Sequence, residues 1–296
     1  MSNPVISQLN VADAVAFSLT QRKLGDKAEG DKKEVTTSAD KEMIKIIKTL
    51  FDCPEFDAIV SFDAAVRKWI YGQTVTLLGR RNLYLTRKEG VKYIDQKMRE
   101  YAGKRKELVD KFIQIYPIII EKAKGQLNGQ YDLGDYLSAE RAARKFGMDW
   151  YYLQLGVPDN LPEDIRQEQQ DKLAKQLNDA GEAIRDGLRV GFVKLVEHLL
   201  ERLKPDADGK PQRFHESNIQ NILDFIDALE RRNLTNDAEL VAVANQAKAL
   251  IEGAEAKTIR QSTKVRTSMI ENMGKVQQAC DKLISPERRR MFDLED

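Results

Sequence analysis

The sequence has few of the residues on which disulfide-stabilised and all-β folds depend. Of its 296 residues only 2 are cysteine, 8 are proline, 17 are glycine and 7% are aromatic. Two cysteines, Cys53 and Cys280, are too few for a disulfide framework and fit a reducing cytoplasm. The low aromatic content argues against a sandwich or barrel, because strands use Tyr, Phe and Trp heavily. The scarcity of proline and glycine leaves room for long helices.

The chain also lacks a charge excess, a long apolar run and a secretory leader. With 48 basic and 47 acidic residues, its total charge gives no reason to expect nucleic acid or a membrane as partner. The most apolar window, Phe112 to Ile120, is far shorter than the ~20 residues that a membrane span needs. The first residues have neither a positive n-region nor an apolar h-region. We therefore expect a cytoplasmic protein with no membrane contact.

Residues for metal binding or catalysis are equally scarce. The histidines are His198 and His215, and no C-x-x-C, H-E-x-x-H or G-x-S-x-G motif occurs. Segment Gly25–Lys32 has the glycine spacing of a phosphate loop, but Asp31 intervenes before the lysine and three acidic side chains would repel a polyphosphate. The carboxylates from Asp159 to Asp186 pair with basic residues at helical spacing, which is typical of a solvated face. We expect no enzyme, no cofactor and no metal.

The first third of the chain mixes extended and helical patterns. Alternation of apolar and polar residues predicts a strand over Ala14 to Leu24. A polar loop follows over 25–37. Helical spacing of apolar residues then predicts helices from about Ser38 to Phe51 and from roughly Phe56 to Leu78, with an extended piece over Leu83–Leu85.

Two long amphipathic patterns dominate the chain. The first predicts a helix from about Val91 to Gly125, on the order of 50 Å long at 1.5 Å per residue, with a kink at Pro117. The second predicts a helix from Pro162 to Leu203. Arg105 is the one position of the first stripe that is neither apolar nor aromatic; the stripe comprises Ile94, Met98, Tyr101, Arg105, Leu108, Phe112, Ile115 and Ile119. We expect the two stripes to bury each other in an antiparallel, coiled-coil-like hairpin.

A compact insert separates the two arms. Ser138 is a typical N-cap for a short helix over Ala139–Phe146 that ends at Gly147. The alternation in DWYYLQL, Asp149–Leu155, predicts a strand, which we expect to pair with Ala14–Leu24 in a small two- or three-stranded sheet.

The same insert permits a helix-turn-helix interpretation, because Ala143 lies four residues before the glycine. A recognition helix should then present polar side chains to base edges. The segment offers Trp150, Tyr151 and Tyr152 instead, so a strand is the better prediction.

The last third predicts helices over Ser217–Arg231, Asp237–Ile251 and Glu255–Ile284, with Asn236 and Glu239 as a capping box. The expected fold class is mainly α, with a long antiparallel helical hairpin, a small β element and a C-terminal helical cluster. The expected segments are 1–90, with a strand and helices; 91–204, the hairpin with its insert at 126–160; and 205–296, the C-terminal helices.

Basic residues gather between Arg80 and Arg105, a segment that contains nine basic and three acidic residues. The returning arm from Asp159 to Glu182 is net acidic. Such a basic end can bind phosphates, associate head to tail with an acidic end, or be merely solvated. The candidate phosphate or partner contacts are Arg80, Arg81, Arg87, Lys88, Lys92 and Arg105.

Three features together have a familiar layout: the early strand AVAFSLTQRKL, the segment SAERAARKFG at Ser138–Gly147, and the stretch Asn221–Leu240. Over residues 12 to 253 the chain resembles an uncharacterised bacterial and phage family, a domain of unknown function found near MoxR-type AAA+ ATPases and von Willebrand A proteins. The resemblance implies a helical accessory or assembly protein, bacterial or phage-encoded, and carries over no catalytic residue.

The sequence thus favours a non-enzymatic interaction or scaffold protein that acts through helical surfaces, with a protein partner or further copies of itself. The alternative is a nucleic-acid-binding protein that uses the basic end of the hairpin. A steep salt dependence of binding to DNA or RNA would support the alternative.

Overall fold

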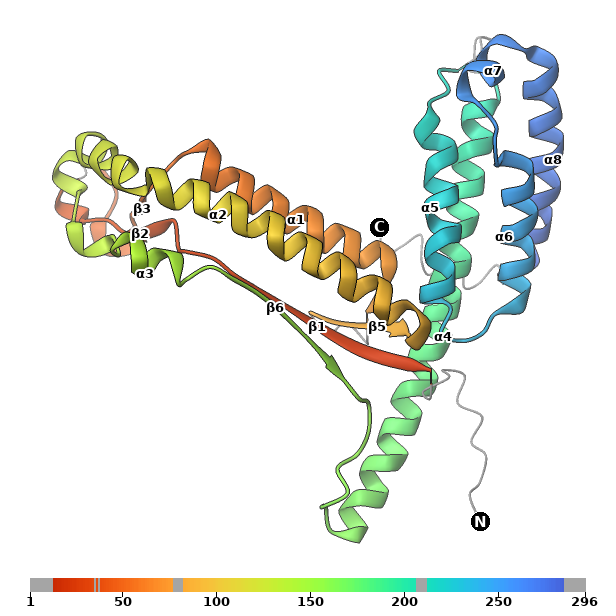
Figure 1. Ribbon diagram of the computed structural model, residues 1–296, viewed down its shortest axis with the longest axis horizontal. Coiled ribbons are helices and arrows are strands. Elements are labelled where there is room, and N and C mark those ends of the chain that lie inside the picture. Colours follow the sequence, from red (N-terminus) through yellow and green to blue (C-terminus); the bar gives the residue numbers. More distant parts are fainter. Residues whose placement is uncertain (1–12, 35, 37, 77–81, 206–211, 285–296) are drawn as a thin grey trace. The chain divides into compact units, whose positions relative to one another are not determined.

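The computed structural model describes residues 13–34, 36, 38–76, 82–205 and 212–284 (Figure 1). In this part of the chain the predicted fold class, mainly α with a small β element, is confirmed. The helices are α1 (Pro54–Gln73), α2 (Val91–Leu127), α3 (Ala139–Ala143), α4 (Glu163–Leu203), α5 (Glu216–Arg232), α6 (Ala238–Ile251), α7 (Ala256–Gln261) and α8 (Thr263–Asp281). None of these described helices is long and apolar enough to cross a membrane.

The strands form two small sheets. Strands β4 (Val75–Thr76), β5 (Leu83–Arg87), β1 (Ala14–Arg22) and β6 (Gly147–Leu153) lie in that order in a four-stranded sheet, in which β4 and β5 are antiparallel. The predicted pairing of the first strand with the aromatic strand of the insert is therefore confirmed, as is the rejection of the helix-turn-helix. Ser138 caps α3 as predicted, accepting a hydrogen bond from the amide of Arg141.

The helix predicted over Ser38–Phe51 is wrong. This segment contains a short 3-10 turn at Lys41–Met43 and then β3 (Ile47–Thr49), which pairs antiparallel with β2 (Lys27–Glu29). Met43 and Ile47 are 86% and 57% exposed and only Leu50 of the expected stripe is buried, at 5%, so these residues do not share one buried helix face. The closely spaced β-branched residues Ile44, Ile46, Ile47 and Thr49 favour the extended backbone instead.

The chain divides into two compact units, each with its own hydrophobic core. Unit 1 comprises residues 1–17, 71–91 and 152–296, and unit 2 comprises residues 18–70 and 92–151. Four elements, β1, α1, α2 and β6, run from one unit into the other.

Unit 2 is built on α1 and α2, which lie side by side in opposite directions (Figure 1). Phe56 on α1 packs on Phe112 on α2 with ring centroids 5.4 Å apart, and further along Trp69 packs on Tyr101 at 5.3 Å. The α2 stripe therefore has α1 as its partner. The predicted pairing of this stripe with the helix over Pro162–Leu203 is wrong, because each stripe is buried within its own unit.

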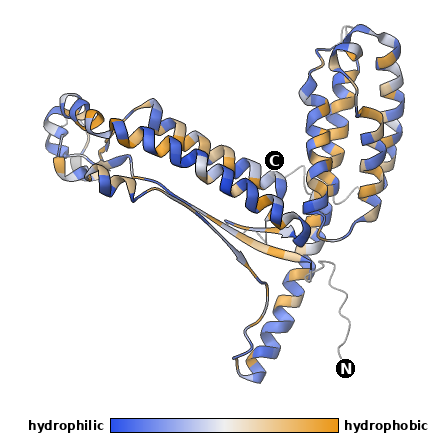
Figure 2. Ribbon diagram, in the orientation of Figure 1, coloured by the Kyte–Doolittle hydropathy of each residue, from blue (hydrophilic) through white to orange (hydrophobic). Residues whose placement is uncertain are grey.

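Unit 1 contains the helical cluster in which α4 packs against α5 and α8, and α8 also against α6. Figure 2 shows hydrophobic positions recurring along these helices. Their shared core contains Phe192 and Leu199 of α4, Ile222 of α5 and Met273 of α8. The single helix expected over Glu255–Ile284 is broken at Ser262, whose side chain caps α8 by accepting from the amide of Val265. Helix α8 packs on its own chain, which sequence reasoning left open.

Arg189 of α4 connects three parts of this cluster. Its guanidinium donates to Asp237 Oδ1 and Oδ2 at 2.8 and 2.5 Å, to Glu239 Oε2 at 2.8 Å and to the carbonyl of Leu283 at 2.7 Å. Asp237 also caps α6 by accepting from the amide of Leu240. Burial would raise the pKa of the Asp237 carboxyl, but the hydrogen bonds from Arg189 and Leu240 hold that pKa below its ordinary value of 3.8.

Replacing Asp237 by asparagine is expected to lower the free energy of unfolding by about 1–3 kcal/mol at neutral pH, because it leaves Arg189 without its main partner. Asparagine still caps the helix. A carboxyl whose pKa is lower in the folded chain stabilises the fold at pH values above its ordinary pKa of 3.8. This stabilisation is lost as the pH falls through the pKa of the folded state. In urea denaturation, the difference in free energy of unfolding between wild type and variant should therefore become smaller below pH 3.8. The control Asp227→Asn, at an exposed position of α5, should have the same free energy of unfolding as the wild type at every pH.

Candidate functional site

Arg105, the exception in the α2 stripe, is buried and fully engaged within unit 2. Its Nε and Nη2 donate to the two carboxylate oxygens of Asp63 at 2.7 and 2.9 Å, and Nη2 also donates to the carbonyl of Arg22 at 2.8 Å. Gln21 donates to the same carboxylate at 3.2 Å. Only 3% of Arg105 is exposed, so the prediction that it contacts phosphate is wrong: its charge is already neutralised in the interior.

Of the other candidate contacts, the structure describes Arg87, Lys88 and Lys92. Arg80 and Arg81 lie outside the described residues. Arg87 lies 3.4 Å from Glu89, and Lys88 forms an ion pair with Asp13, whose hydrogen bond raises the lysine pKa. Lys92 is exposed on the first turn of α2.

Further along α2 the basic residues are paired in the same way. Lys97 lies 2.8 Å from Glu100, and Arg99 lies 2.8 Å from Asp95. Exposed pairs of this kind add little stability, and their acids, Asp95 and Glu100, are already part of the charge count of this segment.

The two histidines take part in capping the first turn of α5. The backbone amide of His215 donates to Asn218 Oδ1 at 2.8 Å, and the Asn218 amide nitrogen lies 3.4 Å from Nε2 of His198. Both imidazoles belong to exposed residues. Over the described part of the chain no three His, Cys, Asp or Glu side chains gather as a metal site would require.

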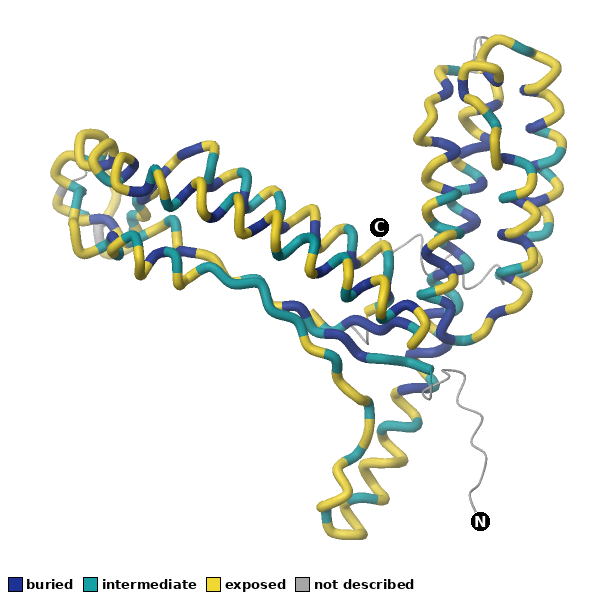
Figure 3. Tube along the Cα trace, viewed as in Figure 1, coloured by how far each residue is buried: buried dark blue, intermediate teal, exposed yellow. Residues whose placement is uncertain are grey.

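A groove lines the first turns of α4 in unit 1. It has a volume of about 460 Å³ and lies between the segment that follows β6, with Gly156, Val157 and Pro158, and the start of α4, with Ile165 and Leu173. Figure 3 shows this end of α4 without buried residues: from Glu163 to Gln176 every residue is exposed or intermediate, and the first buried one is Leu177. The face of α4 that is buried from Leu177 onward is therefore not buried over the first turns of the helix.

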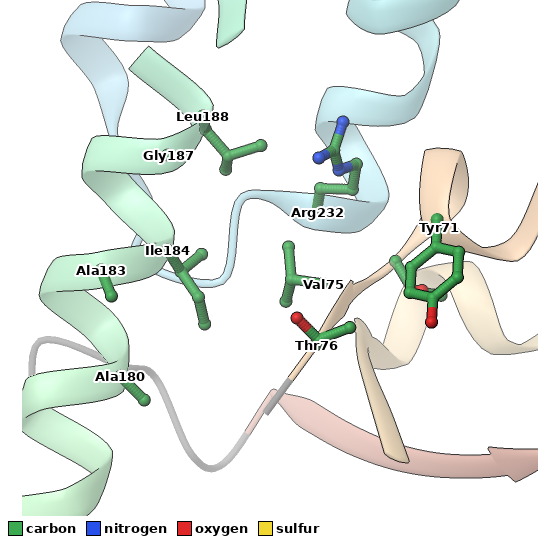
Figure 4. A pocket seen from close by; sticks show the side chains of 10 residues that line it. Tyr71, Val75, Thr76, Ala180, Ala183, Ile184, Gly187, Leu188 and Arg232 are labelled. Carbon is green, nitrogen blue, oxygen red and sulfur yellow. The ribbon is translucent and has the colours of Figure 1, made fainter. Parts of the chain in front are cut away.

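A second cavity in unit 1, of about 410 Å³, lies between α4 and the residues around β4 (Figure 4). Its α4 wall consists of small and aliphatic residues, and Arg232 at the end of α5 lies opposite this wall. The lining comprises Tyr71, Thr74, Val75, Thr76, Ala180, Ala183, Ile184, Gly187, Leu188 and Arg232.

Sequence reasoning missed both the groove and the cavity. The cavity joins residues from three distant segments, and an arginine in the last turn of a helix is so common that it gave no signal. The groove could have been found, because Ile165 and Leu173 continue the Leu177–Ala180–Ile184 stripe at helical spacing.

Comparison with family models, curated proteins and solved structures finds no match to this chain. The resemblance to the uncharacterised bacterial and phage family therefore stays a prediction.

Proposed function

We propose that this protein is a non-enzymatic assembly protein whose copies associate through the amino-terminal half of α4. The observation that carries the proposal is the uncovered stripe of this segment, where Ile165 is 43% exposed and Leu173 is only partly buried. Exposed apolar positions in a row along one helix face are typical of interaction surfaces.

Local interactions stabilise the first turns of α4 only slightly. Residues Glu163 to Gln176 have two ion pairs at helical spacing, Glu163 with Arg166 and Glu168 with Lys172, and each such pair contributes about 0.2–0.5 kcal/mol. Burial of the stripe against a partner would contribute more, at roughly 1.5–3 kcal/mol for each large aliphatic side chain.

The charges of the segment favour a second copy as that partner. Residues 163–176 contain four acidic side chains (Glu163, Asp164, Glu168, Asp171) and three basic ones (Arg166, Lys172, Lys175). Two copies therefore do not repel each other, and acidic side chains of one can face basic side chains of the other. A strongly acidic or strongly basic partner would gain little electrostatic attraction from a segment of such mixed charge.

Replacing both Ile165 and Leu173 by glutamate is expected to weaken self-association by about 100-fold or more, because the two changes each remove an apolar contact worth roughly 1.5–3 kcal/mol. Glutamate is a good helix former, so α4 should persist. Sedimentation velocity over a concentration series measures the effect. The matched control, Gln167→Glu with Gln170→Glu, adds the same charges away from the stripe and should associate like the wild type. Equal weakening by both double variants would show that charge alone, not the stripe, decides association.

A further inference from the structure

The Arg232 guanidinium lacks hydrogen-bond partners of the kind that Arg189, Arg231 and Arg266 of unit 1 have. Arg189 Nε donates to Asp237 at 2.5 Å, Arg231 Nε to Gln73 at 2.9 Å and Arg266 Nε to the carbonyl of Leu203 at 2.6 Å. The Nε of Arg232 is buried, and no described residue accepts a hydrogen bond from it. A buried, unmatched donor on a charged group costs free energy, so the charge of Arg232 is less well compensated than the charges of these three arginines.

The position of Arg232 at the end of α5 accounts for only part of this arrangement. A cation in the last turn interacts favourably with the free carbonyls, and the guanidinium lies over the Phe225 ring, 5.5 Å from its centroid. Neither contact fills the hydrogen-bonding capacity of Nε. Burial lowers the pKa of Arg232, and no nearby acidic group counters this effect.

The cavity beside Arg232 is shaped for an apolar body. The small residues Ala180, Ala183 and Gly187 leave space beside α4, and Ile184 and Leu188 give this wall of the cavity an aliphatic surface (Figure 4). A Cβ atom built on Gly187 would meet no atom within 4 Å, so open space lies in front of this residue. Thr76 and Tyr71 line the opposite side.

We propose that this cavity binds a small organic carboxylate with an apolar body, whose carboxylate accepts hydrogen bonds from Arg232. A guanidinium holds a carboxylate through two parallel hydrogen bonds, which the two terminal nitrogens of Arg232 can provide because only Nε is closed off from solvent. Among the described residues of the lining, Arg232 is the one cationic side chain. A single cation suits a monoanion, whereas a phosphate dianion would be left half neutralised. This inference rests on a different observation from the proposed function and does not depend on it.

Isothermal titration calorimetry of the full chain with benzoate and with hexanoate tests the proposal, and benzamide and hexanamide serve as neutral probes of the same shape. We expect a carboxylate to bind and its amide to bind at least 10-fold more weakly. Arg232→Gln should weaken carboxylate binding by about 10- to 100-fold, the loss that corresponds to a charge-assisted hydrogen bond.

A second variant tests the cavity without touching the charge. Gly187→Leu should abolish binding by filling the space, while leucine keeps α4 helical. The matched control is Gly274→Leu on α8, where a Cβ atom also meets nothing within 4 Å, and it should bind like the wild type. Failure of both carboxylates to bind, binding that survives Arg232→Gln and Gly187→Leu, or Arg232-dependent binding of inorganic phosphate alone would each overturn the proposal.

Discussion

Replacing Arg105 by methionine is expected to lower the free energy of unfolding by about 3–5 kcal/mol, since it leaves the Asp63 carboxylate in the interior without its partner. The Asp63 side chain is only 5% exposed, and Gln21 alone cannot neutralise it. Urea denaturation followed by tryptophan fluorescence measures the loss of stability in unit 2. Both tryptophans of the chain belong to unit 2, where Trp69 packs on Tyr101 and Trp150 donates to Asp95.

Two further variants separate the ion pair from simple loss of a side chain. Arg105→Met combined with Asp63→Leu removes both charges and should recover most of the lost stability, because an apolar pair of similar volume often replaces a buried ion pair without cost. Lys104→Met changes the exposed neighbour and should stay within about 0.5 kcal/mol of the wild type. A double variant as unstable as Arg105→Met would mean that the loss does not come from the unpaired Asp63 carboxylate.

The second large effect is expected in unit 1. Phe192 on α4 is fully buried and packs on Phe225 with ring centroids 5.5 Å apart. Phe192→Ala should lower the free energy of unfolding by about 3–5 kcal/mol, through lost burial and the cavity that remains. Far-UV circular dichroism during urea denaturation reports the loss of the unit 1 helices.

Because the core around Phe192 lies in unit 1, the substitution should lower the urea midpoint measured by tryptophan fluorescence less than the midpoint measured by circular dichroism. Val265→Ala, at an exposed position of α8, is the control and should stay within about 0.5 kcal/mol of the wild type. A loss of less than 1 kcal/mol for Phe192→Ala, on the order of a surface substitution, would contradict the assigned core.

The elements of the fold were largely predictable, but one central pairing was not. The stripes on α2 and α4 show that each helix must bury a face, and the helices were found close to their actual bounds. Periodicity does not say which partner covers a stripe. The actual partner, α1, carries its own signal: Asp63 lies on its buried face between Ile59 and Val66, and an acid there matches the arginine on α2.

The candidate sites depended still more on tertiary structure. Arg105 was recognisable as an anomaly in its stripe, yet only the fold shows that it is an internal ion-pair partner. The Arg232 cavity takes residues from the end of α1, from β4, from the middle of α4 and from the end of α5. No local pattern marks such a combination, because each residue type is ordinary in its own element.

The mass of the particle in solution, measured by light scattering over a dilution series of the wild-type chain, tests the proposed function most directly. Association through the first turns of α4 predicts a particle of at least twice the 33.8 kDa of one chain that dissociates on dilution. A particle that remains at 33.8 kDa up to the highest soluble concentration would contradict self-assembly through this surface.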